Sequence, residues 1–223
     1  MLRRVFLPNL LLLTTPRAAG WTNRAYTSST QPRTATTMAQ QQQKQQPSLV
    51  WIDCEMTGLA STDKLIEIAV IITDDDLNII AEGPNLIIHQ PKEVMDSMNQ
   101  WCVDHHGASG LTASVLASKI STSEACNQVL QFIKSHIPTP RHGILAGNSV
   151  HADKVFLERE MSPIIEHLHY RIVDVSTVKE LARRWFPKEF ESVPRKKEAH
   201  RALDDIKESI GELKYYRSSV FKN

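Results

Sequence analysis

Two carboxylates lie within a stretch of sequence that otherwise has the composition of a buried strand. Asp53 and Glu55 alternate with Ile52, Cys54 and Met56. Because the side chains of a strand alternate between its two faces, the acids share one face and the apolar residues share the other. Two anions this close resist joint ionisation unless a cation neutralises them, and carboxylate oxygens suit a hard divalent ion. The stretch therefore predicts a metal site, with an edge strand whose acids face water as the alternative.

Two further acids and a histidine are placed where they could join this pair. Asp153 opens an expected helix directly after a short apolar strand, the kind of turn at which open α/β sheets place ligands. Helix capping and compensation of the helix dipole would explain Asp153 without a metal. Asp205 lies on the last expected helix, five residues after His200. At about 100° per residue, Asp205 borders the apolar stripe of this helix, whereas Asp204 faces solvent.

Apolar periodicity and breaker residues indicate the elements that hold these side chains. Three consecutive strands joined by short connections predict an antiparallel meander, and two later strands alternate with helices, as in an α/β sheet. The expected strands are 50–56, 65–73, 78–89, 143–147 and 170–175. The expected helices are short ones after residue 92, then 123–136, one beginning near 153, 177–185 and 200–217, with an exposed loop over 187–199.

The charge of the chain is distributed unevenly. Residues 1–46 contain six basic residues and no acid, so the other residues carry 20 basic against 25 acidic side chains, a formal charge of −5. Affinity for a long polyanion grows with the number of phosphates that Lys and Arg neutralise, so a phosphate-bearing substrate is expected to be short or gripped locally. The three cysteines lack zinc-type spacing and are odd in number, which argues against a structural zinc and a disulfide framework.

The first 46 residues have the composition of a mitochondrial presequence, because they are rich in Arg, Ser, Thr and Ala and free of acids. A secretory signal with an apolar centre at 5–13 is the competing interpretation, although Pro8 interrupts that centre. No apolar run reaches the ~20 residues of a membrane span, so no membrane partner is expected. The prediction is a leader over 1–46 and one domain over 47–223, located in mitochondria, with Met38 as an internal start for a cytoplasmic form.

The set formed by Asp-x-Glu, a central Asp and a late His-x-x-x-x-Asp resembles the DEDDh exonucleases. Five stretches narrow the resemblance to the oligoribonuclease family, over about residues 48–221; they are 51–59, 146–149, 169–177, 179–185 and 200–206. His151 and Ala152 depart from many bacterial members but leave Asp153 in place. The resemblance implies a ribonuclease-H-like (DnaQ-like) α/β fold with a central mixed five-stranded sheet flanked by helices.

The resemblance also implies an activity. Family members remove nucleotides from the 3′ end of very short single-stranded RNA, dinucleotides above all, as homodimers. Two Mg²⁺ or Mn²⁺ ions would be held by four carboxylates, and His200 would act as the general base. The implied metal ligands are Asp53, Glu55, Asp153 and Asp205. A catalytically silent nucleic-acid-binding module and a phosphodiesterase acting on a small non-nucleic ester are the alternatives.

A set of implied substrate contacts completes the resemblance. Leu59 and Trp101 would flank the terminal bases, the latter by stacking. Core packing is the alternative for these two, and strand-end or helix-cap hydrogen bonding is the alternative for the residues that follow. The implied contacts to the 5′ phosphate are Ser149 and His106 on one side and, supplied by the partner subunit, Tyr170, Arg171, Ser176 and Thr177, with Tyr170 also counted as catalytic.

Overall fold

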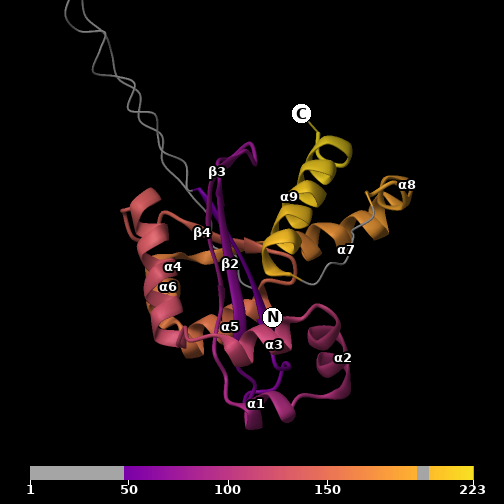
Figure 1. Ribbon diagram of the computed structural model, residues 1–223. Coiled ribbons are helices and arrows are strands. Elements are labelled where there is room, and N and C mark those ends of the chain that lie inside the picture. The colour runs from indigo at the N-terminus through magenta and orange to yellow at the C-terminus, as the bar shows by residue number, and fades with distance from the viewer. Residues whose placement is uncertain (1–47, 195–200, 223) are drawn as a thin grey trace, which may run out of the picture. The chain divides into compact units, whose positions relative to one another are not determined.

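The structure is a computed structural model that describes residues 48–194 and 201–222. The described residues form one five-stranded sheet with helices on both faces (Figure 1). The strand order is β3-β2-β1-β4-β5, with β1 to β3 antiparallel to one another and β4 and β5 parallel to β1. The strands are β1 (Leu49–Met56), β2 (Leu65–Thr73), β3 (Ile79–Ile87), β4 (Ile144–Gly147) and β5 (His169–Asp174). The predicted α/β fold with a mixed five-stranded sheet is confirmed.

Nine helices lie in the described part of the chain. They are α1 (Lys92–Asp96), α2 (Gln100–Ala108), α3 (Leu111–Ala117), α4 (Thr122–His136), α5 (His151–Glu160), α6 (Ser162–His167), α7 (Val175–Trp185), α8 (Pro187–Glu191) and α9 (Ala202–Ser219). The prediction of a continuous loop over 187–199 is wrong at α8, where Pro187 opens a short helix. The hydroxyl of Tyr215 on α9 donates to the carbonyl of Glu189 at 2.6 Å, which holds this helix against α9.

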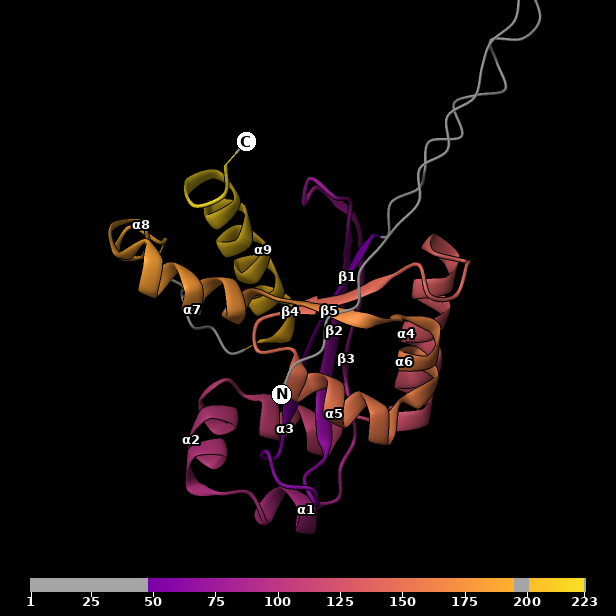
Figure 2. The ribbon, with the colours of Figure 1, turned by 180° about the vertical axis from the view of Figure 1, so that it is seen from behind.

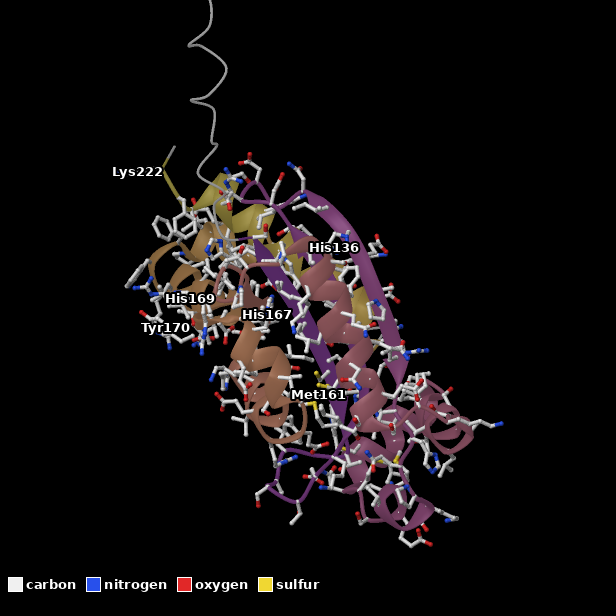
Figure 3. All side chains as sticks on the ribbon, turned by 90° about the vertical axis from the view of Figure 1, so that its left-hand side faces the viewer. His136, Met161, His167, His169, Tyr170 and Lys222 are labelled. Carbon is white, nitrogen blue, oxygen red and sulfur yellow. The ribbon has the colours of Figure 1, made fainter. Side chains whose placement is uncertain are left out.

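The sheet separates two apolar cores. On one face, Val50, Ile52 and Cys54 of β1 pack with α4, α5 and α6, and the buried Met161 lies in this layer (Figure 3). On the other face, Trp51 of β1 packs against Ile206 on α9. Figures 1 and 2 show α4 and α6 on one side of the sheet and α7 and α9 on the other. Strand alternation therefore turns residues 53 and 55 toward the α9 side.

Strand β2 is buried along its whole length, as its run of apolar and β-branched residues predicts. Its last residue, Thr73, accepts a hydrogen bond from the indole of Trp51 at 3.0 Å. This bond joins the first half of β1 to the end of β2. In the described residues we find no helix whose length and apolar character would let it cross a membrane. The predicted leader over 1–46 lies outside the described residues, and the proposed domain boundary stays a prediction.

Candidate active site

Three carboxylates meet where β1 ends and α9 begins. One oxygen from each of Asp53, Glu55 and Asp205 lies within 4.8 Å of the others. The first two share the α9 face of β1, and Asp205 lies in the first turn of α9, half-buried, while Asp204 beside it is exposed. The predicted register of the last helix is thus correct. Three carboxylate oxygens at this spacing form a donor set that suits a hard divalent cation.

The fourth predicted acid, Asp153, binds the backbone of β1 with its side chain. Strand β4 pairs only with the first three residues of β1, so the later N–H groups on that edge lack a strand partner. Asp153 lies in the first turn of α5 with only 6% of its surface exposed, and its Oδ1 accepts the N–H of Cys54 at 2.9 Å. Asp153 is not one of the three residues within 4.8 Å, but its charge is the strongest acting on Asp53.

Burial and neighbouring carboxylates raise the pKa values of Asp53, Glu55 and Asp153. Burial, followed by the charges of Asp153 and Glu55, raises the pKa of Asp53 well above its usual range. Burial, followed by the charge of Asp205, raises the pKa of Glu55 to about 8. Burial raises the pKa of Asp153 to about 7. The hydrogen bond from the N–H of Cys54 has the opposite effect and lowers this pKa, but it is the smaller of the two effects. A site that resists ionisation in this way gains strongly from a bound cation, so the acids fit the predicted divalent ions.

A neighbouring acid is neutralised by the protein itself. Glu67 on β2 lies directly across the sheet register from Glu55 and has none of its surface exposed. The guanidinium of Arg201 binds its carboxylate, with Nη2 3.0 Å from Oε1. Sequence reasoning missed this pair because its members are 134 residues apart and neither belongs to a recognised motif.

The two residues predicted to flank the bases are both at the surface. Leu59 is 77% exposed and Trp101 is 60% exposed, so core packing does not explain either. The indole of Trp101 stacks on the imidazole of His105, with ring centroids 3.8 Å apart. His106, one residue further on α2, is buried, and its Nε2 lies 2.9 Å from the carbonyl oxygen of Met56 at the end of β1.

The loop that carries Leu59 is held by a carboxylate that the sequence did not indicate. Asp63 accepts the hydroxyl of Thr57 at 2.9 Å and the N–H of Ala60 at 2.7 Å. A Cβ added at Gly58 would lie 2.5 Å from Asp63 Oδ2, so a larger residue at this position would require the Asp63 carboxylate to move. The loop that presents Leu59 to solvent is therefore held in place by Asp63.

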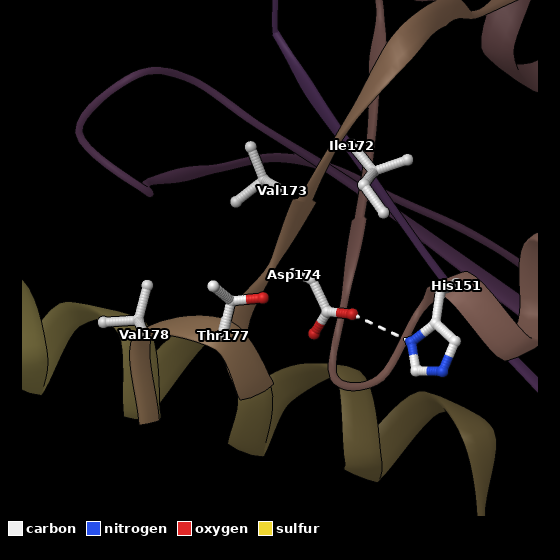
Figure 4. Close-up of a pocket in the computed structure, with 6 residues that line it drawn as sticks. All are labelled: His151, Ile172, Val173, Asp174, Thr177 and Val178. Atoms are coloured by element: carbon white, nitrogen blue, oxygen red, sulfur yellow. Dashed lines mark hydrogen bonds and ion pairs between the residues drawn. The ribbon is translucent and has the colours of Figure 1, made fainter. Parts of the chain in front are cut away.

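The predicted phosphate contacts lie on the β4–α5 turn and at the start of α7. The hydroxyls of Ser149 and Ser176 are 2.9 Å apart, and that of Ser176 donates to Asn148 Oδ1 at 2.7 Å. Thr177 is exposed beside them and lines an open cavity of about 480 Å³ (Figure 4). The other residues that line this cavity are His151, Ile172, Val173, Asp174 and Val178.

The remaining predicted contacts lie on β5. Tyr170 is exposed, stacks on His169 with ring centroids 4.5 Å apart, and carries the Arg171 guanidinium 5.2 Å from its ring centre (Figure 3). Both side chains face solvent, so they are available to a second molecule. His200, the predicted general base, lies outside the described residues.

The sequence matches the model of the exonuclease family RNase_T over residues 50–213. Over 175 residues it is 57% identical to proteins named "Oligoribonuclease, mitochondrial" from Mus musculus and Homo sapiens, a match that covers 78% of this chain and 73% of each relative. A "Probable oligoribonuclease" from Dictyostelium discoideum is 55% identical over 177 residues, covering 78% of this chain and 90% of that protein.

Solved structures with the same fold are more distant in sequence. Exonuclease I from Methylocaldum szegediense superposes with a TM-score of 0.57 at 18% identity, covering 78% of this chain and 41% of that one. A zinc-bound complex of E. coli exonuclease I with single-stranded DNA gives a TM-score of 0.61 at 15% identity, covering 79% and 41%. The chain thus spans about two fifths of these enzymes, and at this identity the likeness concerns the fold.

Proposed function

The chain belongs to the oligoribonuclease family, and from this premise we propose that it is a 3′-to-5′ exoribonuclease that hydrolyses very short oligoribonucleotides to mononucleotides. The single observation that carries the proposal beyond the family is the meeting of Asp53, Glu55 and Asp205 at the end of β1, with Asp153 beside them. These acids come from a strand and two helices that are far apart in the sequence.

The four acids are the proposed ligands of two Mg²⁺ or Mn²⁺ ions. When bound, such ions generate a nucleophile from water and stabilise the charge that develops on the leaving oxygen. The fold contributes rigidity, since Asp53 and Glu55 are fixed by a central strand and Asp153 by its bond to Cys54. His200 is the proposed base that accepts the proton of the attacking water, because a histidine titrates near neutral pH.

Cleavage of a labelled dinucleotide tests this proposal directly. We expect a 5′-labelled diribonucleotide to be converted to mononucleotides with Mg²⁺ or Mn²⁺ and to remain intact with a chelator. A silent binding module would retain the dinucleotide without cleaving it. A phosphodiesterase for a small non-nucleic ester would leave it untouched but would hydrolyse a chromogenic phosphodiester when metal is added. The same assay with a deoxyribodinucleotide determines the preference between RNA and DNA.

We further propose that the enzyme prefers substrates of two nucleotides. The body of the chain is acidic and offers little to a long strand. Leu59, three residues after β1, and Trp101, on the helix that contacts the end of β1 through His106, are both exposed and would flank two bases. Tyr170 and Arg171 of a partner subunit would close around the 5′ phosphate in a homodimer, since the Arg fork binds phosphate oxygens in pairs. A dinucleotide should be cleaved far faster than a 20-mer, and Arg171→Ala should remove the difference. A length preference that survives this substitution would contradict the closed arrangement.

The location of the protein is also a proposal. The acid-free composition of residues 1–46 and the names of the mouse and human relatives support import into mitochondria, with Met38 as the start of a cytoplasmic form. A fluorescent fusion of residues 1–46 should enter mitochondria, and one that begins at Met38 should remain in the cytosol. Entry of the first fusion into the secretory pathway would show that the leader is a signal peptide.

A further inference from the structure

One carboxylate outside the predicted site joins the two segments that carry the serine contacts. Asp174, the last residue of β5, accepts the N–H of Ser149 and the N–H of Ser176 on the same oxygen, Oδ1, each at 2.9 Å. Its other oxygen lies 3.2 Å from Nδ1 of His151 (Figure 4). Because Ser149 follows β4 and Ser176 opens α7, this single side chain fixes the distance between two separate elements.

The conformation of the first segment depends on this bond. Ser149 has a φ of 54°, in the left-handed region that a residue with a Cβ rarely adopts. An N–H bound to a carboxylate compensates for such a conformation, and without it the turn would relax toward an ordinary φ. Asp174 therefore sets the direction in which the Ser149 side chain points, not only its distance from α7.

The pair of hydroxyls is held from the opposite side by α9. Asn148 accepts the hydroxyl of Ser176 with its oxygen and donates its amide to Oε2 of the buried Glu212 at 3.2 Å. Because an ionised carboxylate only accepts hydrogen bonds, Glu212 keeps the amide nitrogen of Asn148 toward α9 and its oxygen toward Ser176. Glu212 and Asn148 thus fix Ser176, and the bond from Asp174 brings Ser149 to it.

We propose that Asp174 is a positioning residue that holds Ser149 and Ser176 of the same chain as a preformed pair of hydroxyls for the 5′ phosphate, so that Ser176 comes from the chain that supplies Ser149 and not, as the family resemblance implied, from the partner subunit. This pair gives the enzyme its preference for 5′-phosphorylated ends. This inference rests on the proposed function. Two hydroxyls 2.9 Å apart match the separation of neighbouring phosphate oxygens closely enough to bind them together once both hydroxyls turn outward. The negative charge of Asp174 does not oppose the phosphate fully, because two N–H groups and the His151 ring surround it.

Substitution of Asp174 by serine distinguishes the two roles of this residue, its hydrogen bond to the N–H of Ser149 and its capping of α7. Serine is itself a good N-cap, so Asp174→Ser keeps α7 capped but is too short to hold Ser149 as well. We expect the ratio of kcat/KM for 5′-phosphorylated over 5′-hydroxyl diribonucleotide to fall about tenfold, the scale of one hydrogen bond to a charged group, chiefly through KM. In Asp174→Asn the amide oxygen still accepts both N–H groups, so the ratio should stay within about twofold of the unmodified enzyme.

Ser121→Ala is the matched control for lost helix capping. Ser121 caps α4, on the other face of the sheet, by accepting the N–H of Glu124 at 3.2 Å, so its loss lowers stability without reaching the site. The ratio should be unchanged in this variant. An unchanged ratio in Asp174→Ser, or an equal fall in Asp174→Asn, would overturn the inference. Failure of the unmodified enzyme to cleave either dinucleotide would overturn the proposed function and this inference with it.

Discussion

Glu55 and Glu67 lie opposite each other on neighbouring strands, and the protein treats their charges in contrasting ways. Glu67 is completely buried and bound by the guanidinium of Arg201. For Glu55 and its strand neighbour Asp53, the strongest charged neighbours are other carboxylates, and the pKa of both is raised. A buried carboxylate that is neutralised by an arginine of the protein contributes to structure. A cluster of carboxylates without such a partner carries uncompensated repulsion, which a bound cation can relieve.

The neutralised acid also positions the others. Arg201 immediately precedes α9, and Asp205 lies in the first turn of that helix. The ion pair between Glu67 and Arg201 therefore anchors the start of α9 to the sheet at the level of Glu55. The comparison between the two acids yields four predictions, which are ordered here by the size of the expected effect.

The largest effect is expected from the acids that lack a protein cation. Asp53→Asn and Asp205→Asn should each reduce dinucleotide turnover by on the order of 10³-fold or more, because each removes a charged ligand of the proposed metal ions, which stabilise the transition state. Asp204→Asn changes the exposed neighbour of Asp205 and should alter turnover less than about threefold, as a surface substitution away from the site. Initial rates at saturating Mg²⁺, with circular dichroism of each variant, measure the contrast. Equal losses in the Asp204 and Asp205 variants would contradict the helix register.

The second effect concerns the neutralised acid. Arg201→Gln leaves Glu67 buried without its cation and should lower the free energy of unfolding by about 3 kcal/mol. The matched double variant Glu67→Gln/Arg201→Gln removes both charges and should recover most of the loss. Urea unfolding at pH 7 measures both values. A loss of stability in the double variant as large as in the single one would show that the ion pair is not what holds the start of α9.

The third effect is a pH dependence of the metal-free protein. Glu55 and Asp153 have pKa values of about 8 and about 7 in the fold but titrate near 4 when unfolded, so the native state binds more protons between these limits. Stability should therefore fall as pH rises from about 4.5 to 8, by about 2 kcal/mol after allowance for solvent screening. Urea unfolding with EDTA at pH 5.5 and 8 measures the slope. Saturating Mg²⁺, or the double variant Glu55→Gln/Asp153→Asn, should flatten it, and a slope unaffected by either would assign the titration to other groups.

The features predicted correctly from the sequence are those that depend on the spacing of apolar residues within a single helix or strand. The bounds of β2 were predicted without error, because its run of buried apolar residues ends at turn-forming aspartates. The exposed Asp204 and half-buried Asp205 followed from helical geometry alone. The mixed five-stranded sheet came from the family resemblance, whereas the full order of its strands was not predicted, because periodicity does not determine which strands are neighbours.

The features that were missed depend on contacts between distant segments. The pairing of Glu67 with Arg201 spans 134 residues, and Glu67 alone reads as one polar residue in an apolar strand. The bond from Asp153 to the N–H of Cys54 was missed because it depends on which residues of β1 pair with β4, and periodicity does not determine the register between two strands. The bridge made by Asp174 was missed because a residue at a strand end before a helix has the ordinary explanation of an N-cap.

The smallest effect comes from an ion pair at the other end of α9. Arg217 binds Asp76 in the β2–β3 turn with Nη2 2.7 Å from Oδ1, but both side chains are largely exposed, at 49% and 70%. Solvent screens such a pair, so Arg217→Gln should cost at most about 0.5 kcal/mol and leave turnover unchanged. The substitution matches Arg201→Gln in chemistry, and a main difference between the two variants is that the carboxylate that loses its partner is buried in Glu67 and exposed in Asp76. Urea midpoints of the two variants, measured side by side, should therefore differ by several-fold in their shift. A similar shift for both would mean that the arginines contribute through general attachment of α9, and that burial of Glu67 is not the source of the effect.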